Sequence, residues 1–345
     1  MPEEVKKPVT QESNKLFIGV DCGTMNLVCQ RSDKNEITKI RNVFLSVTED
    51  DIPTSDLGNI SSVRDEESGN IYIIGEDAFK FANLFGQPLQ RPMRSGLISS
   101  KEIDAADVLL LMIKSLIGDI KNKDCYCNYS IPAEPIDEER SIIYHTELFR
   151  RIFNDLGITA APINEAMGII YSECKDDEFS GCAFSFGAGM VNCSISWKGL
   201  NTICFSTVRS GDWIDSHVSE SLNIVQNRVT AFKENKLDLA NVKVENKKER
   251  RILEALKYYY EAALTHAMKK TIKKFQEEFE IEIDESIPIV VSGGTSLAKG
   301  FVDLFKNLAA TLDWPFEIKE IRQAKNPLTC VAEGLLIKTL ADFKK

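Results

Sequence analysis

Phe17–Gln30 reads FIGVDCGTMNLVCQ, two apolar segments separated by a polar turn that contains glycine. Apolar segments of this kind are typical of buried strands, so the stretch predicts a hairpin. Gly23 lets the backbone approach a ligand closely. The N–H groups and the hydroxyl around Gly23, Thr24 and Asn26 can face phosphate oxygens in an anion-binding nest.

Asp21 places a carboxylate at the start of this turn, beside the predicted anion site. A carboxylate there makes sense where a hydrated Mg²⁺ lies between it and the phosphates, because Mg²⁺ keeps several waters and takes few protein ligands. The alternative is a turn in which Asp21 and Asn26 cap their own backbone. The turn alone leaves both interpretations open.

The composition is that of a globular protein with enough surface to bury for two domains, with 345 residues, 43% apolar and 27% charged. The formal net charge of −10 argues against broad binding of nucleic acid or anionic membranes, since proteins that neutralise phosphate backbones usually carry a basic face. Local basic patches are compatible with this charge. We therefore expect no nucleic acid as a partner and no direct membrane anchor.

The nine cysteines lack a paired CxxC spacing, and the close pair Cys125 and Cys127 would point to one face of a strand. We expect the cysteines to form neither a metal site nor disulfides, and we expect a reducing cytosol. Residues 1–15 have no apolar signal core and no amphipathic stripe, which indicates a flexible tail. Residues 179–197 carry no charge, but their Gly and Ser content argues against a membrane-spanning helix.

Strand and helix patterns alternate beyond the first hairpin, which is typical of a layered α/β domain. Residues 36–91 form a mixed segment that we interpret as a small inserted subdomain. The expected elements that follow are a helix over 104–120, a strand over 125–131, a helix over 136–156, a strand over 159–163 and a helix from 165. Asp137, Glu138 and Glu139 would complement the helix dipole at the start of the second of these helices.

Two further glycine-rich turns follow apolar strands. The turn Gly-Ala-Gly at 187–189 lies between two strands and repeats the first hairpin, which predicts a duplicated architecture. The turn Ser-Gly-Gly-Thr-Ser at 292–296 follows the strand 287–291 and precedes a helix through Phe301. A backbone that approaches a ligand this closely can lie flat against a purine.

With these three turns, the sequence resembles the actin, Hsp70 and sugar-kinase superfamily, and within it the prokaryotic actins of the MreB and MamK type. The resemblance covers about residues 16–340. The matching stretches are Asp21-x-Gly23-Thr24, Gly75-Glu76-Asp77-Ala78, Arg94-Ser95-Gly96-Leu97-Ile98, Gly187-Ala188-Gly189, Gly293-Gly294 with Ser296, and Asn326 to Gly334. The inserted subdomain after the first turn favours true actins over the FtsA type.

The resemblance implies an α/β fold with two similar actin-like (ribonuclease H-like) domains around a nucleotide cleft, each with an inserted smaller subdomain. It also implies ATP and Mg²⁺ as cofactors and self-assembly into a filament homopolymer. The expected boundaries are a tail over 1–15, domain I over 16–162 plus 325–345 with its insertion at about 36–91, and domain II over 163–324 with a helical insertion at about 206–284.

The resemblance further assigns roles to individual residues. Asp21 would hold the metal ion and act together with Glu165, which would orient the attacking water, since phosphoryl transfer depends mostly on positioning and electrostatics. The alternative for Glu165 is an exposed side chain at a helix start. The nucleotide contacts would come from Gly23, Thr24, Asn26, Gly187, Ala188, Gly189, Lys233, Gly293, Gly294 and Ser296.

At several positions the sequence departs from the family pattern in ways that bear on ATP hydrolysis. Ser185 stands where the second turn normally begins with Asp, and a hydroxyl cannot hold hydrated Mg²⁺ as a carboxylate can. Met190 and Asn192 replace the usual Thr and Asp. Thr230 lies one turn before Lys233, where a Glu usually contacts the ribose. Backbone donors still allow nucleotide binding, but we expect any ATPase activity to be weak.

The longest helical pattern, over 249–279, carries its apolar residues on one stripe. We interpret this stripe as core packing in preference to a coiled-coil partner site. The three histidines, His145, His217 and His266, are scattered, and we assign them no chemistry.

Two function classes stay open at this point. The first is an ATP-binding filament protein of the bacterial cytoplasm and cytoskeleton, whose slow hydrolysis weakens the filament, with a cargo or adaptor protein as a further partner. The second is a degenerate actin-like scaffold or adaptor without ATP turnover. A small-molecule kinase is the weaker alternative, because no acceptor-side base stands out.

Overall fold

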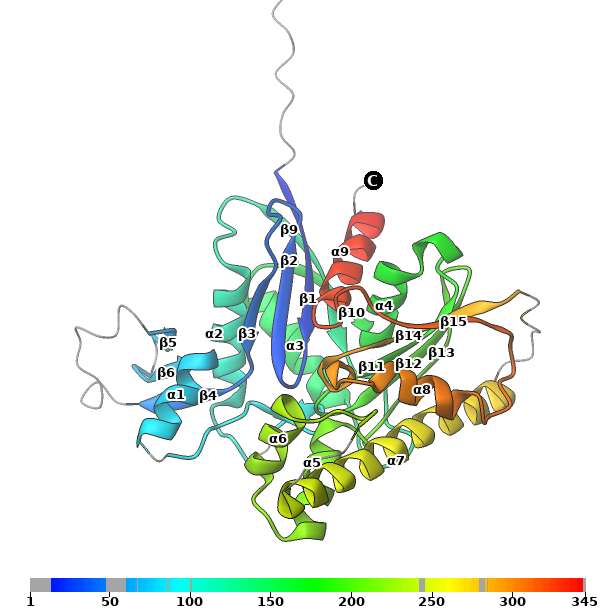
Figure 1. Cartoon of the computed structure of the whole chain (residues 1–345). Helices are drawn as coiled ribbons and strands as arrows, with labels where there is room; N and C mark the ends of the chain where they lie inside the picture. The colour runs from blue at the N-terminus through cyan, green and yellow to red at the C-terminus, as the bar shows by residue number, and fades with distance from the viewer. Residues whose placement is uncertain are drawn as a thin grey trace, which may run out of the picture.

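The computed structural model describes residues 14–47, 60–66, 68–85, 87–99, 101–241, 246–278, 283 and 285–343. Apart from residues 14 and 15, the predicted flexible tail lies outside these ranges. The described chain forms a mixed α/β fold with two five-stranded sheets, as predicted (Figure 1).

The first sheet is built around the hairpin with which the described chain begins. Its strands are, in spatial order, β10 (Thr159–Asn164), β9 (Asp124–Ile131), β1 (Lys15–Cys22), β2 (Asn26–Arg31) and β3 (Thr38–Arg41). The hairpin strands β1, β2 and β3 pair antiparallel, while β1, β9 and β10 pair parallel. The strands predicted over 125–131 and 159–163 are confirmed.

The second sheet repeats this arrangement. Its strands are, in spatial order, β15 (Ile318–Gln323), β14 (Ile287–Ser292), β11 (Gly181–Phe186), β12 (Val191–Trp197) and β13 (Leu200–Thr207). It too has an antiparallel meander on one side of the central strand β11 and parallel strands on the other. The predicted duplication is confirmed, and β11 is the counterpart of β1.

Helices α4 (Glu165–Glu173) and α9 (Cys330–Phe343) pack against each other between the two sheets. They cross where glycine faces glycine, because a Cβ atom added to Gly334 would lie 1.8 Å from the Gly168 carbonyl oxygen. α9 also contacts β1, and α4 contacts β11, so each half of the molecule supplies one helix to the junction.

The other face of the first sheet is covered by α2 (Ala105–Ile117) and α3 (Ile143–Asp155), which share its apolar core. A smaller unit with its own core extends from this half (Figure 1). It consists of β4 (Phe44–Val47), β5 (Ser62–Arg64), β6 (Ile71–Ile74) and α1 (Gly75–Phe85), and the hairpin of β7 (Met93–Arg94) and β8 (Leu97–Ile98) follows it.

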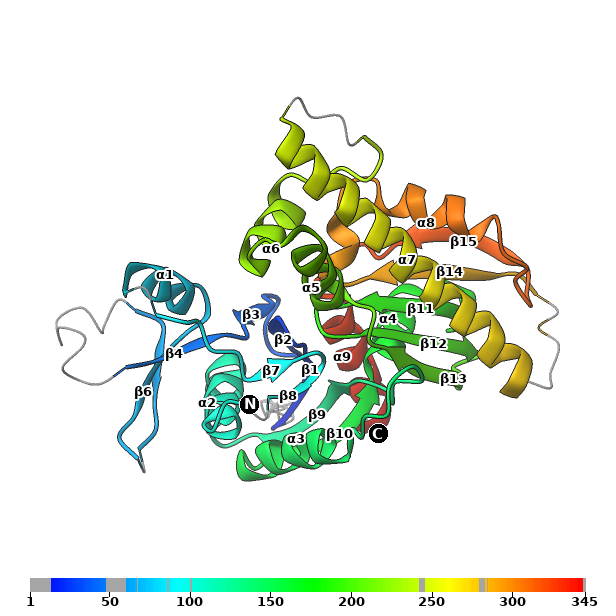
Figure 2. The same cartoon turned by 90° about the horizontal axis from the view of Figure 1, so that it is seen from below.

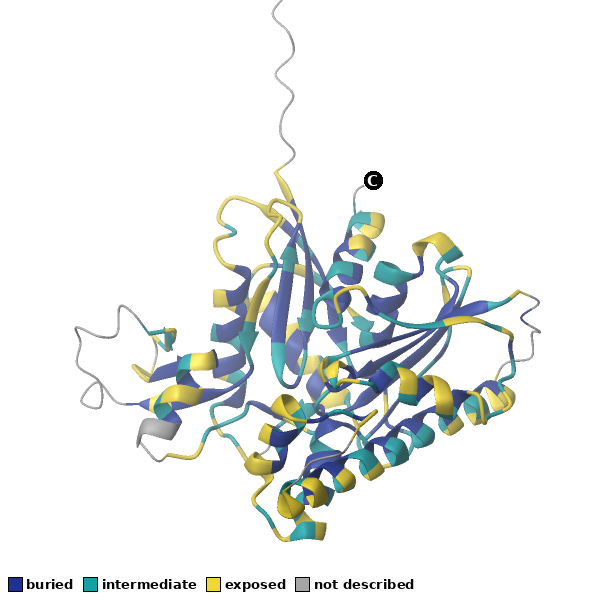
Figure 3. Ribbon diagram, viewed as in Figure 1, coloured by how far each residue is buried: buried dark blue, intermediate teal, exposed yellow. Residues whose placement is uncertain are grey.

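The second half carries helices instead of a small sheet. They are α5 (Gly211–Leu222), α6 (Gln226–Asn235), α7 (Lys247–Glu278) and α8 (Phe301–Ala309), with short 3₁₀ segments at Lys175–Asp177 and Gly294–Leu297. α7 packs against β12, β13, α5 and α8 (Figure 2). Its stripe, including Leu256, Tyr260, Leu264 and Met268, is buried in the second core, as predicted (Figure 3).

The prediction of one helix over 136–156 was wrong for its first part, because α3 begins only at Ile143. Residues 136–142 instead make contacts with other elements. The Asp137 carboxylate accepts a hydrogen bond from the Val208 N–H (3.1 Å), and Arg140 donates to the Ser95 carbonyl (3.1 Å). The acidic residues that suggested a helix start are therefore engaged in tertiary contacts.

None of the helices in the described ranges is long and apolar enough to cross a membrane. All nine cysteines are free, and eight of them are buried. The described residues also contain no group of three or more His, Cys, Asp or Glu side chains that could hold a metal ion.

Candidate functional site

The first turn places Asp21 at the end of β1, next to the last residues of β9. Its Oδ1 accepts a hydrogen bond from the Ser130 hydroxyl (2.7 Å), and the same hydroxyl accepts one from the Cys22 N–H (2.8 Å). Burial raises the pKa of Asp21 to about 6, while the bond from Ser130 opposes this shift. Oδ2 makes no hydrogen bond within the described chain, so it can accept a ligand.

Gly23 is required by the shape of the turn, because a Cβ atom there would lie 2.6 Å from the Asn26 carbonyl oxygen. The Gly23 carbonyl accepts a hydrogen bond from the side chain of Asn42 (3.1 Å). The backbone N–H groups of Gly23 and Thr24 have no hydrogen-bond partner in the described structure. They are therefore available to an anion.

The second turn has the same character. The Gly187 carbonyl accepts from the Thr295 hydroxyl (2.9 Å) and from the Gly211 N–H (3.1 Å). The Ala188 carbonyl accepts from the Ser210 hydroxyl (2.6 Å). The carbonyls are thus occupied by the start of α5 and by the third turn, whereas the N–H groups of Ala188 and Gly189 have no partner among the described residues.

The first and second turns touch each other. A Cβ atom at Gly189 would lie 2.0 Å from the Gly96 nitrogen and 2.6 Å from the Thr24 hydroxyl oxygen. The side chain of Met190 lies against Gly96 in the same way, with its Cγ 2.5 Å from the position of a Gly96 Cβ. Only glycine fits at these contacts, which bring the two sets of free N–H groups together.

The third turn lies beside the second. Gly293 has a positive φ of 88°, and a Cβ atom there would lie 2.4 Å from the Phe186 carbonyl oxygen. The Ser296 hydroxyl donates to the Gly293 carbonyl (2.7 Å), which fixes the turn. Gly294 has no atom closer than 3.9 Å to its Cβ position, so this part of the backbone is open to a neighbour.

Glu165 is the first residue of α4 and reaches the second sheet. Its Oε1 accepts a hydrogen bond from the Ser185 hydroxyl (2.5 Å), and its Oε2 accepts one from the Asn192 side chain (2.8 Å). Burial raises the pKa of Glu165 to about 8, and the charge of Asp21 adds to this shift. Both oxygens are therefore used in tertiary bonds, unlike those of an exposed glutamate at a helix start.

Lys233 has a partner that the sequence did not reveal. Its ammonium group lies 2.8 Å from Asp215 Oδ2 and donates to the Gly211 carbonyl (3.1 Å). The Thr230 hydroxyl donates to the same Asp215 oxygen (2.7 Å). α5 thus supplies a buried carboxylate next to Lys233, close to the position on α6 where Thr230 replaces the family's Glu.

The residues present fit a nucleotide and a hydrated Mg²⁺. Among the described residues, Asp21 offers one carboxylate oxygen without a hydrogen bond, and the two turns offer four N–H groups without a partner at a place where both sheets meet. Such a donor set suits a metal that keeps most of its waters and phosphates that accept backbone hydrogen bonds. Ser130, Thr295 and Asp215 support the site but were not among the predicted residues.

The two repeated sheets and the three turns define an actin-like fold. The sequence matches the Volactin family over residues 16–339, and the chain belongs to that family. No curated protein matches the sequence.

Solved structures support the assignment of the fold. The MamK double helical filament has 17% identity, covers 93% of this chain and 98% of its own chain, and has a TM-score of 0.65. MreB 5 of Spiroplasma citri bound to AMPPNP has 16% identity, 98% coverage of both chains and a TM-score of 0.68. The ethanolamine utilization protein EutJ from Carboxydothermus hydrogenoformans has 14% identity, 97% and 91% coverage and a TM-score of 0.53. At these identities the likeness establishes an actin-like fold.

Proposed function

We propose that this protein binds ATP with Mg²⁺ between its two halves and assembles into cytoskeletal filaments in the cytoplasm. The observation that carries the proposal is the contact of the first and second turns at Gly189 and Thr24, with unpartnered N–H groups on both sides and Asp21 beside them. Structures of similar fold include one bound to AMPPNP, one bound to ADP and a MamK filament, which supports both parts of the proposal.

In this proposal the first and second turns bind the phosphates, and the third turn contacts the base. The N–H groups at Gly23, Thr24, Ala188 and Gly189 bind the phosphates, and Asp21 Oδ2 holds the hydrated metal. The open backbone at Gly294 faces the base. Lys233, held by Asp215, lies near the second and third turns and contributes positive charge at the nucleotide.

A bound Mg²⁺ would neutralise charge on the phosphates and help to align them. The residues of this chain do the remaining work. Glu165 orients the attacking water, and Ser185 and Asn192 fix the position of its carboxylate. Because Ser185 stands in place of a second acid, we propose that hydrolysis is slow. The expected loss in rate is roughly 10²–10³, which corresponds to a missing group worth about 2.7–4 kcal/mol.

A nucleotide titration and a sedimentation assay test this proposal. We expect calorimetric heat on addition of ATP with Mg²⁺, and more protein in the pellet with ATP than without it. Asp21→Ala should weaken the Mg²⁺-dependent part of binding, whereas Asp313→Ala, a change at an exposed acid, should not. No heat and no stabilisation at millimolar ATP would contradict nucleotide binding.

A scaffold that binds nucleotide without turning it over is the second candidate, and the replacement of the second acid by Ser185 favours it. The two candidates differ in phosphate release and agree in nucleotide binding. Filaments that form with ATP and never release phosphate would favour the scaffold.

A further inference from the structure

A cavity of about 630 Å³ lies along α7, and four cationic side chains are among those that line it. We call it the basic groove, and its cations are Arg209, Lys269, Lys270 and Lys273, with the imidazole of His266 beside them. Glu261 is the one acidic residue among those that line it. Tyr258, at one end, exposes 65% of its surface, so the groove also offers an aromatic side chain to a partner.

Most of the cations of the basic groove have no acidic partner. Within the part of the chain that the structure describes, Arg209, Lys269 and Lys270 form no ion pair. Lys273 pairs with Glu277 at 3.5 Å, one turn further along the same exposed helix face. In a chain with a net charge of −10, such a cluster attracts negatively charged partners.

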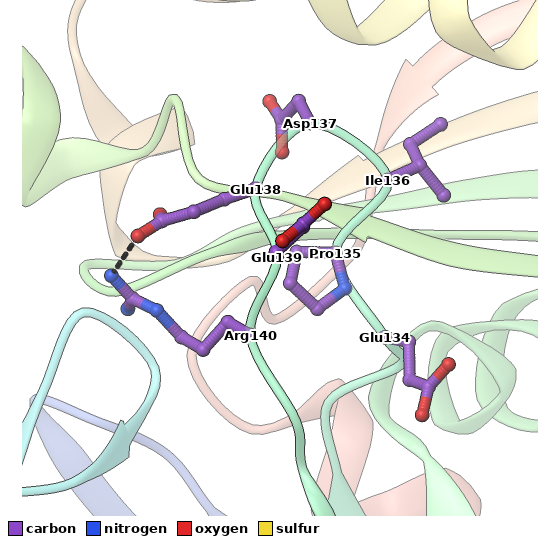
Figure 4. A pocket seen from close by; sticks show the side chains of 7 residues that line it. All are labelled: Glu134, Pro135, Ile136, Asp137, Glu138, Glu139 and Arg140. Carbon is purple, nitrogen blue, oxygen red and sulfur yellow. Dashed lines mark hydrogen bonds and ion pairs between the residues drawn. The ribbon is translucent and has the colours of Figure 1, made fainter.

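A second concave surface, of about 460 Å³, is formed by the chain between β9 and α3 (Figure 4). We call Glu134–Arg140 the acidic loop, since it carries four carboxylates and one guanidinium group. Glu138 pairs with Arg140 at 2.6 Å. Glu134 and Glu139 are exposed and form no ion pair with any described residue.

The acidic loop borders the basic groove. Asp137 of the loop lies 2.8 Å from the Nε2 atom of His266 in the groove, and its other oxygen accepts from the Val208 N–H, next to Arg209. Two adjacent surfaces of opposite charge complement themselves under a two-fold rotation, because each surface then meets its opposite on the other copy.

We propose that this face is a contact between two copies of the chain, in which the acidic loop of each copy lies against the basic groove of the other. A nucleic acid fits the surface less well, since the carboxylates beside the groove would repel its phosphates. The contact is isologous. It therefore differs from the head-to-tail contact of an open polymer and goes beyond the filament proposed above.

Charge reversal on each surface tests the contact without nucleotide. Lys269→Glu/Lys270→Glu makes the face mostly acidic, and Glu134→Lys/Glu139→Lys makes it mostly basic. We expect sedimentation velocity to give dimers for the wild-type protein and at least tenfold weaker association for each variant alone. An equimolar mixture of the two variants should associate again, since the attraction is restored between unlike copies.

Two controls make the result specific. Lys34→Glu/Lys306→Glu has the same change in net charge at exposed lysines elsewhere and should associate like the wild type. Raising the salt from about 0.1 M to about 1 M should weaken association of the wild type and of the mixture, because the screening length falls to about 3 Å. Thermal unfolding of each variant verifies that it is folded.

Three results would overturn the inference. They are a monomeric wild-type protein at high concentration, association of the variants that equals the wild type, and failure of the mixture to associate although both variants are folded. Each of these is independent of ATP binding and of filament formation, so the proposed function would stand. Conversely, loss of ATP binding would leave the contact between copies untouched.

Discussion

The two halves of the molecule use equivalent strands and turns but distribute acid and hydroxyl differently. In the first half the acid is on the central strand, at Asp21, and the neighbouring strand supplies the hydroxyl of Ser130. In the second half the central strand carries the hydroxyl, at Ser185, and the acid bonded to it is Glu165 at the start of α4. Each half thus contains one hydrogen bond between a serine hydroxyl and a carboxyl group.

This difference distinguishes the groups that we propose to bind the nucleotide from those that we propose to set the rate of hydrolysis. The free N–H groups and the close glycine contacts are present in both halves, so they belong to the shared architecture. In the proposed function, only the first half supplies an acid from its central strand beside the phosphates. We therefore expect binding to depend on what the halves share, and the rate of hydrolysis to depend on how they differ.

The largest expected effect comes from removing the acid of the second pair. Glu165→Ala deletes the carboxylate that Ser185 and Asn192 hold, and should lower phosphate release by roughly 10²–10³, in the range found for single groups that act by positioning. ATP affinity should change little. Glu254→Ala, a change at an exposed acid on α7, is the control. A Glu165→Ala variant with wild-type turnover would exclude this residue from the chemistry.

The next prediction concerns the junction of the halves. Gly334→Ala places a Cβ atom 1.8 Å from the Gly168 carbonyl, so α4 and α9 must separate. We expect the free energy of unfolding to fall by about 3 kcal/mol, the upper part of the range for overpacking. Unfolding in urea measures this change in the free energy of unfolding. Gly294→Ala, where the nearest atom is 3.9 Å from the Cβ position, is the matched control and should change stability far less.

A third prediction concerns pH. Burial raises the pKa of Asp21 to about 6 and of Glu165 to about 8, above the ordinary values of 3.8 and 4.5. At these two carboxyl groups the folded protein therefore binds more protons than the unfolded chain, and the stability that they contribute is complete below about pH 4 and is lost as the pH rises through 6 to 8. Without nucleotide, the protein should become less stable over this range.

Glu165→Gln isolates the acid of the second half, since it cannot ionise. Its free energy of unfolding, measured in urea at a series of pH values, should fall less steeply than that of the wild type between about pH 6 and pH 8. Parallel curves for the two proteins would contradict the pKa assigned to Glu165.

The features that the sequence predicted are those encoded by neighbouring residues. The hairpin of β1 and β2, its repeat in β11 and β12, and the stripe of α7 each follow from local patterns of apolar residues and glycine. The two hairpins predicted the duplication, and the alternation of strand and helix patterns predicted the α/β class.

The features that the sequence did not reveal depend on residues far apart in the chain. The sequence around Asp137 suggests the start of a helix. In the structure Asp137 instead contacts Val208, which directly follows β13, and His266 on α7. The bond between Ser185 and Glu165 joins two elements, and Asp215 reaches Lys233 from a different helix. Local pattern cannot specify such pairs, because only the tertiary packing of separate elements brings them together.

The most direct test of the difference between the halves is steady-state phosphate release by the wild type and by Ser185→Asp, with ATP and Mg²⁺ under polymerising conditions. We predict slow release by the wild type and an increase of roughly 10²–10³ in Ser185→Asp, since the missing acid is worth about 2.7–4 kcal/mol. The increase should vanish when Glu165→Ala is added. Wild-type turnover as fast as that of a prokaryotic actin measured alongside, or no response to Ser185→Asp, would contradict it.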